Sequence, residues 1–325
     1  MNRIFTNNDV ACELNRQKII QKISMPIKYR KFDSQDRKPI YNLFRETLWD
    51  YMLQYGIVDI DDANEIDEVF RQQKNLYIHL EQTASGDWVA EDDDQGLVGW
   101  ARSVERDSHL QLTHFFVKTA VQGGGVGRAL LDLAFPLDRG RQRSIVATAN
   151  PRALSLYLRD NVSFQGMAFI FNGEPRIREF DSDLEIERAE ASSKTLESIS
   201  AIDAQVLGYR RLIDLEFFMN NQPTFLFRRS GRLVAYAFGC AGNSGGPAAA
   251  LDPEDLPTLL YQIESSAHQA ELDSLSLMIP AVAKRAVSWA LNSGYRIQPF
   301  YTVLLAKNSM MNLNRFIMTP SGFVW

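Results

Sequence analysis

The chain of 325 residues contains only two cysteines, too few for a disulfide framework or a thiolate metal site. Its four histidines show no spacing typical of metal ligands, so we expect no structural metal. No apolar run approaches the roughly 18 residues that a membrane span requires, and residues 1–25 are polar and lack the apolar core of a signal peptide. These absences predict a cytoplasmic protein with no membrane partner.

The chain also lacks an excess of positive charge. Lysine and arginine number 35 and aspartate and glutamate 40, which gives a formal net charge of −5. Such a balance provides no general attraction for nucleic acid, so we expect no nucleic-acid partner. A hydrophobic content of 45% is ordinary for a globular protein, and the length favours two domains over one.

The most informative segment is the run QGGGVGRALL at 122–131, which follows an apolar strand-like segment and leads into a helical pattern. Glycines allow the backbone to turn its N–H groups inward, and the positive end of the next helix can then hold an anion. A nucleoside triphosphatase loop would need Gly-Lys-Ser/Thr where the chain has Gly127, Arg128 and Ala129. The dinucleotide pattern G-x-G-x-x-G also fails, from Gly123 and from Gly125. We therefore interpret the run as a pyrophosphate-binding turn of another kind.

Two motifs carry a family resemblance. Gln122, Gly125 and Gly127 fit the pattern Gln/Arg-x-x-Gly-x-Gly/Ala, and downstream the segment 150–157 fits Asn-x-x-Ala-x-x-x-Tyr. With both motifs in this order and spacing, the chain resembles the GNAT superfamily of acetyl-CoA-dependent N-acetyltransferases. The resemblance implies an α+β fold, acetyl-CoA as cosubstrate, and an amine on a small molecule or peptide as the acceptor.

The resemblance also implies roles for individual residues. The end of the strand at 114–117 would offer backbone groups to the amides of pantetheine, and the glycine turn would hold the pyrophosphate. Arg152 would reach the 3′-phosphate of CoA, and Tyr157 would protonate the departing CoA thiolate. Purely structural roles remain open, since Asn150 suits a helix N-cap before Pro151, Arg152 a solvated arginine and Tyr157 a core aromatic. The cofactor-binding residues expected on this basis are Phe116, Val117, Gln122, Gly123, Gly124, Gly125, Val126, Gly127, Arg128, Asn150, Arg152 and Ala153.

The base that removes a proton from the amine is less clear. His114 is the best-placed histidine, on the strand expected to line the site, although a histidine buried in the core is the commoner outcome. Glu105 and Asp107 are alternatives at the end of the preceding strand. The acids at 59–68 could attract a cationic substrate, or could merely stabilise a helix N-terminus and face water.

The order of predicted strands and helices repeats along the chain, which indicates two copies of one fold. We predict an N-terminal arm at 1–26, an acetyl-CoA-binding GNAT-like domain at 27–180 and a degenerate GNAT-like domain at 181–325. Each domain is expected to be a mixed, mostly antiparallel sheet flanked by helices. The second copy replaces the glycine turn by the acidic segment 251–257, and it has Ala283 and Ala290 where the first has Asn150 and Tyr157.

The sequence thus predicts a tandem GNAT-like N-acetyltransferase with one working domain. Three alternatives stay open: a non-catalytic regulator that binds acyl-CoA, an acyltransferase resembling mycothiol synthase, and a protein-interaction platform in which the second copy exposes an apolar groove. The acceptor, the preferred acyl chain and the oligomeric state are not specified by these patterns.

Overall fold

The computed structural model describes residues 27–57, 67 and 71–319. The predicted N-terminal arm at 1–26 lies outside the described residues. The same holds for most of the acidic cluster, namely Asp59, Asp61, Asp62, Glu65 and Glu68. Its described member, Asp67, forms an ion pair with Arg45 at 2.9 Å and accepts a hydrogen bond from the Tyr41 hydroxyl.

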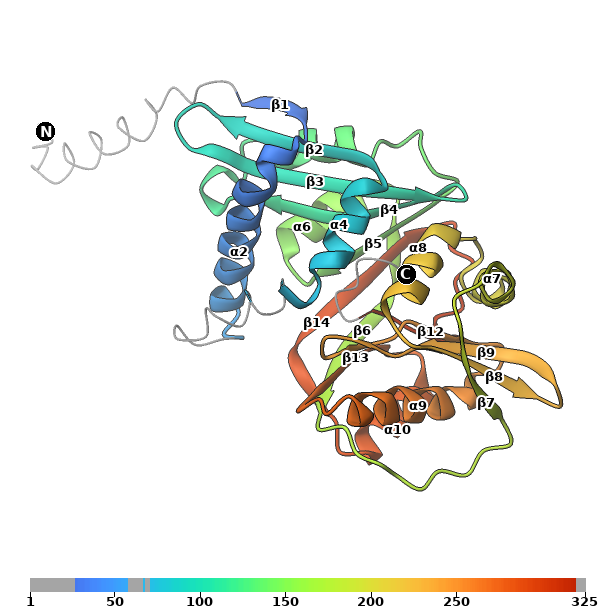
Figure 1. The fold of residues 1–325 in the computed structure, drawn as a ribbon. Coiled ribbons are helices and arrows are strands. Elements are labelled where there is room, and N and C mark those ends of the chain that lie inside the picture. Colours follow the sequence, from blue (N-terminus) through green and yellow to red (C-terminus); the bar gives the residue numbers. More distant parts are fainter. Residues whose placement is uncertain (1–26, 58–66, 68–70, 320–325) are drawn as a thin grey trace, which may run out of the picture.

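The N-terminal half combines strands with helices that lie against them (Figure 1). Helix α5 forms where the sequence places apolar residues on one face, and these residues, Val126, Leu130, Leu131 and Ala134, are buried against the sheet. The elements are β1 (Lys28–Lys31), α2 (Arg37–Gln54), α4 (Lys74–Gln82), β2 (Ala84–Asp92), β3 (Gly96–Arg106), β4 (His109–Val117), α5 (Val126–Ala134), β5 (Gln142–Thr148), α6 (Pro151–Leu158) and β6 (Ser163–Gly173).

The C-terminal half repeats much of this order after residues 174–184, which contain neither helix nor strand. Its elements are β7 (Glu185–Ala189), α7 (Ser193–Leu207), α8 (Leu212–Asn221), β8 (Thr224–Arg229), β9 (Arg232–Phe238), β10 (Cys240–Ala241), β11 (Ser244–Gly245), β12 (Ala248–Ala250), α9 (Leu256–Gln269), β13 (Leu275–Pro280), α10 (Lys284–Asn292), β14 (Arg296–Lys307) and β15 (Phe316–Ile317). The predicted α+β class, with mixed sheets flanked by helices, is confirmed.

The two halves share strands. One sheet has the order β1-β2-β3-β4-β5-β14-β6-β13-β11-β10, and a second, antiparallel sheet has the order β15-β12-β9-β8-β7. Strand β14 of the C-terminal half thus lies between β5 and β6 of the N-terminal half (Figure 1). Backbone hydrogen bonding continues across both halves, and the domain boundary at 180/181 stays a prediction.

The glycine-rich segment 242–247 contains strand β11, which pairs with two other strands. Strands β10 and β11 flank a tight turn there, and Ser244 of β11 also pairs with Ser276 of β13. A Cβ at Gly245 would lie 2.5 Å from the Ile263 side chain of α9. Glycine at this position therefore permits close packing of helix on strand, which composition alone does not distinguish from flexibility.

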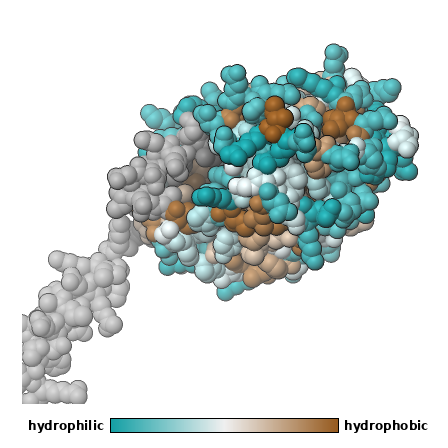
Figure 2. All heavy atoms as spheres, turned by 90° about the horizontal axis from the view of Figure 1, so that it is seen from below, coloured by the Kyte–Doolittle hydropathy of each residue, from teal (hydrophilic) through white to brown (hydrophobic). Residues whose placement is uncertain are grey.

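The surface is mainly hydrophilic on the face shown in Figure 2, where apolar side chains form several separate groups. Within the described residues, no helix combines the length and apolar character needed to cross a bilayer. The same part of the chain holds no group of three or more side chains suited to bind a metal ion.

Candidate active site

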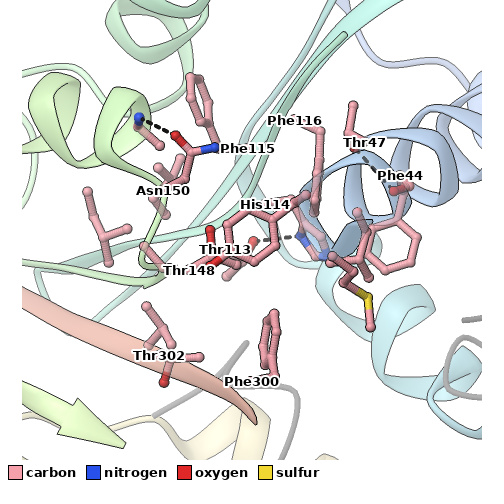
Figure 3. A pocket seen from close by; sticks show the side chains of 18 of the residues that line it. Phe44, Thr47, Thr113, His114, Phe115, Phe116, Thr148, Asn150, Phe300 and Thr302 are labelled. Atoms are coloured by element: carbon pink, nitrogen blue, oxygen red, sulfur yellow. Dashed lines mark hydrogen bonds between the residues drawn. The ribbon is translucent and has the colours of Figure 1, made fainter. Parts of the chain in front are cut away.

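A wedge opens between β4 and β5. The two strands are parallel and paired from His109 and Gln142 to Leu112 and Ile145, and their pairing then stops. Beyond this point β4 stays paired with β3 as far as Val117, while β5 stays paired with β14. A cavity of about 1120 Å³ occupies the wedge and extends below it, bounded by β4, β5, α2 and β14 (Figure 3).

The glycine turn lies at one end of this cavity. Gly123 and Gly125 take φ values of 90° and 87°, which favour glycine, and a Cβ at either position would meet no atom within 4 Å. Gly125 is the N-cap of α5, and the first N–H bonded within the helix is that of Ala129, to the Gly125 carbonyl. The N–H groups of the first helical turn are thus available to an anion beside an open glycine backbone.

Gly127 has a different role. Its φ is not in the left-handed region, and a Cβ there would come within 3.2 Å of both the Leu156 and the Phe115 side chains. A side chain at Gly127 would thus crowd its neighbours within the protein. Gly127 allows α5 to pack closely against β4 and α6.

Polar side chains connect the turn to its neighbours. The Gln122 amide donates a hydrogen bond to the Val117 carbonyl at 2.9 Å, and Arg152 donates to the Gln122 amide oxygen at 3.0 Å. Arg128 forms ion pairs with Asp132 and with the buried Asp160, at 2.5 Å from the latter. The Arg128 charge is therefore already balanced by two carboxylates, whereas Arg152 faces no carboxylate among the described ion pairs.

Helix α6 begins as the sequence indicated. The Asn150 side-chain oxygen accepts hydrogen bonds from the backbone N–H groups of Arg152 and Ala153, at 2.9 and 3.3 Å, and Pro151 occupies the first turn. The Asn150 side chain also lines the cavity (Figure 3). At the far end, Asn161 takes φ 59°, a left-handed conformation that asparagine tolerates after a helix.

Tyr157 lines the cavity one helical turn after Ala153. The side chain is buried, and its ring makes an edge contact with Phe115 at a centroid distance of 5.6 Å. Within the described residues its hydroxyl has no hydrogen-bond partner. Burial raises the pKa of Tyr157 well above its usual value, so the phenol stays protonated at neutral pH.

His114 lies on β4 among aromatic rings. It stacks on Trp100 at 4.4 Å, contacts the Tyr77 ring at 5.3 Å, and its Nδ1 lies 3.0 Å from the Thr113 hydroxyl (Figure 3). Burial, followed by the charge of Arg102, lowers the pKa of His114 well below its usual value. The imidazole is therefore neutral at physiological pH. Of the alternative bases, Glu105 pairs with Arg139 and Asp107 accepts from the Arg210 N–H, and neither lines the cavity.

Because His109 is buried, we expect the protein to lose stability in mild acid. Burial, with a smaller contribution from Arg211, lowers the pKa of His109 to about 3, while in the unfolded chain it titrates near 6.5. The unfolded state thus binds more protons than the native state once the pH falls below about 6.5, and stability falls with it. From pH 7 to pH 5 we expect His109 to account for about 2 kcal/mol of lost stability.

Urea unfolding at the two pH values measures this loss. In a His109→Gln variant the difference in unfolding free energy between pH 7 and pH 5 should shrink by about 2 kcal/mol. An unchanged difference would show that His109 is not held neutral in the native state.

The sequence did not identify the residues that the C-terminal half contributes to the cavity. Strand β14 has three residues between Ile297 and Tyr301 where β6 has only one between their partners, and this bulge directs 298–300 toward the cavity. Phe300 makes an edge contact with Tyr51 of α2, with a distance of 6.2 Å between the ring centroids. Thr302 lies opposite Thr148 of β5 and also lines the cavity.

The C-terminal half has no equivalent of the glycine turn. Its corresponding helix follows Asp252, whose side chain accepts from the Glu254 N–H, and the nearby Asp255 pairs with Arg229. At the start of α10, Ala283 provides no side-chain cap, and Ala290 is fully buried in the core. An anion would meet carboxylates there in place of open N–H groups.

Comparisons with known proteins agree with this geometry. Residues 44–161 match the model of the Acetyltransferase (GNAT) family. Over 91% of this chain and 95% of that one, the structure resembles a putative acetyltransferase from Pyrococcus horikoshii, with 15% identity and a TM-score of 0.65. A GCN5-related N-acetyltransferase from Sphaerobacter thermophilus has 16% identity and a TM-score of 0.60, over 87% of this chain and 96% of that one.

The similarity extends to proteins with two such units. A tandem GNAT protein from the clavulanic acid biosynthesis pathway has 12% identity and a TM-score of 0.50, over 86% of this chain and 98% of that one. No curated protein gives a significant match. Residues 44–161 thus match the GNAT family model, and the chain shares its fold with acetyltransferases that include a tandem GNAT protein.

Proposed function

We propose that the chain is an acetyl-CoA-dependent N-acetyltransferase in which residues 27–180 bind the cofactor and residues 181–325 complete the acceptor site. One observation carries the proposal. The β4–β5 wedge, the open glycine backbone at Gly123 and Gly125, and the capped start of α6 all meet at a single cavity. An acyl-CoA needs a phosphate site and an extended channel, and the wedge and turn offer both.

Each part of the cavity suits a part of acetyl-CoA. The first-turn N–H groups of α5 and the backbone of 122–127 suit the diphosphate, with Arg152 beside them. The unpaired edge of β4 near Phe116 and Val117 suits the pantetheine amides, and Asn150 and Ala153 line the opposite side. When bound, the cofactor supplies an acetyl group activated as a thioester.

Tyr157 is the acid of the proposed reaction. Its phenol holds a proton across the neutral range, and its hydroxyl is not engaged by described residues, so it can give that proton to a sulfur leaving beside α6.

His114 is the proposed proton acceptor near the amine, although its low pKa makes it a weak base. The amine is therefore expected to react as the free base, and kcat/KM should rise with pH until the amine is deprotonated.

A non-catalytic acyl-CoA-binding regulator is the second candidate. It is favoured by one observation: the described residues that line the cavity include no aspartate, glutamate or lysine, and the histidine among them is neutral. Measuring CoA release from acetyl-CoA with a panel of amines separates the two candidates. Release that depends on the amine supports the enzyme, whereas saturable binding of acetyl-CoA without release supports the regulator.

A further inference from the structure

Three polar side chains lie in register on one face of the large sheet. Ser244 of β11 pairs with Ser276 of β13, and Ser276 pairs with Asn172 of β6. Directly paired residues on neighbouring strands place their side chains on the same face, about 5 Å apart. All three line the cavity below the β4–β5 wedge. We call these residues, together with Thr302 of β14, the polar row.

Thr302 is buried and lacks a partner for its side chain. Its relative exposure is 7%, and its hydroxyl has no hydrogen-bond partner among the described residues. It lines the same cavity, across from Thr148 (Figure 3). No hydrogen bond joins the side chains of Asn172, Ser244 or Ser276 to any described residue.

Other buried hydroxyls of this sheet are satisfied. Thr113 donates to the Arg102 carbonyl at 3.1 Å, Ser144 lies 2.6 Å from the His109 ring, and Ser103 donates to the Ala134 carbonyl at 2.5 Å. Buried polar side chains nearly always have a partner, so an unpaired hydroxyl that faces a cavity points to a ligand. The Thr302 hydroxyl is thus a buried donor and acceptor that faces the cavity and has no partner among the described residues.

The chemistry of the polar row restricts that ligand. It consists of three hydroxyls and one amide, all uncharged and each able to donate and accept. The cations among the described lining residues, Arg128, Arg152 and Arg159, belong to α5, α6 and the end of α6, at the cofactor side. A neutral acceptor body rich in hydroxyl groups matches such a surface better than a polyamine does.

A peptide acceptor fits less well. Strands β6 and β13 are interior strands whose backbone groups are bonded to neighbours on both sides. A peptide could not extend the sheet at this place, and only the side chains of the polar row are available to it. This leaves a compact ligand that carries its own donors and acceptors.

We propose that the polar row binds the hydroxyl-bearing body of the acceptor, and that the acceptor is a primary amine of the amino-sugar or amino-polyol class. The inference rests on the proposed function. It assigns the C-terminal half a task of its own, since Ser244, Ser276 and Thr302 all come from that half and none is part of the cofactor site.

Steady-state kinetics with the full chain test the proposal. Glucosamine and cyclohexylamine, an amine on a ring without hydroxyl groups, are compared at equal concentrations of the uncharged form. We expect kcat/KM to be at least about 10-fold higher for glucosamine. Higher turnover of cyclohexylamine, spermidine or a dipeptide would overturn the assignment. CoA release with none of these amines would instead count against the proposed function itself.

Variants of the polar row sharpen the test. Thr302→Val removes an unpaired buried hydroxyl at nearly constant volume, so thermal stability should not fall. For glucosamine we expect kcat/KM to drop about 10-fold, mostly through KM, while the values for cyclohexylamine stay within about twofold. Ser276→Ala should change the kinetics with the two amines in the same way as Thr302→Val. Ser198→Ala, which removes an exposed α7 hydroxyl bonded to the Lys194 carbonyl, is the control. Equal losses for both amines, or none, would refute the role of the polar row.

Discussion

Replacing Tyr157 by phenylalanine is expected to lower kcat about 100-fold while acetyl-CoA binding stays unchanged. The phenol lines the cavity from α6, and burial keeps it protonated. General acid catalysis typically contributes 10²- to 10⁴-fold, and the lower value applies because water can protonate a thiolate slowly. Phenylalanine preserves the edge contact with Phe115, so the fold should be kept. Stopped-flow or steady-state measurement of CoA release gives kcat, and calorimetry gives the affinity.

Tyr51 offers a matched control for this variant. It also lines the cavity, but its hydroxyl interacts with Thr148 and with the backbone of Ala149. Tyr51→Phe should therefore reduce kcat by less than about fivefold. If the two variants lost kcat to the same extent, or if Tyr157→Phe kept more than half of it, Tyr157 would not be the acid.

Replacing Gly125 by valine is expected to weaken acetyl-CoA binding at least 100-fold. Two effects add. Valine strains a backbone at φ 87°, which disturbs the N–H groups of the turn, and its side chain fills the open space beside them. The dissociation constant is measured by calorimetry with acetyl-CoA and separately with CoA, because both carry the diphosphate.

Gly96 provides the control for backbone strain. It has φ 67° at the turn between β2 and β3, and a Cβ there would likewise meet nothing within 4 Å. Gly96→Val should cost similar stability but leave the affinity for acetyl-CoA unchanged. If the Gly125 and Gly96 variants bound acetyl-CoA with equal affinity, the diphosphate would not bind at the glycine turn.

Local features of the site could be predicted from the sequence because their geometry is set by neighbouring residues in the chain. Asn150 and Pro151 specify the start of α6, and Asn161 specifies its end. The glycines at 123 and 125 likewise specify the turn before α5. The roles of Asn150, Gly123 and Gly125 toward a cofactor stay predictions, and all three residues line one cavity.

The acceptor side could not be predicted, because it depends on long-range strand pairing. Phe300 and Thr302 reach the cavity because β14 inserts between β5 and β6. The apolar pattern of a strand does not reveal which strand it pairs with. The reason for a glycine also cannot be predicted from the sequence, as Gly127 and Gly245 show. Both are required by close packing, which in a sequence looks the same as a flexible or ligand-contacting glycine.

We propose that the chain has one acyl-CoA site, at the glycine turn of the N-terminal half. Calorimetric titration of the full chain with acetyl-CoA measures it most directly, through the number of sites and their loss in the Gly125→Val variant. We predict one site per chain, and no measurable binding in that variant at concentrations that saturate the unmodified protein. No binding to the unmodified chain, two sites per chain, or one site that survives the substitution would contradict the claim.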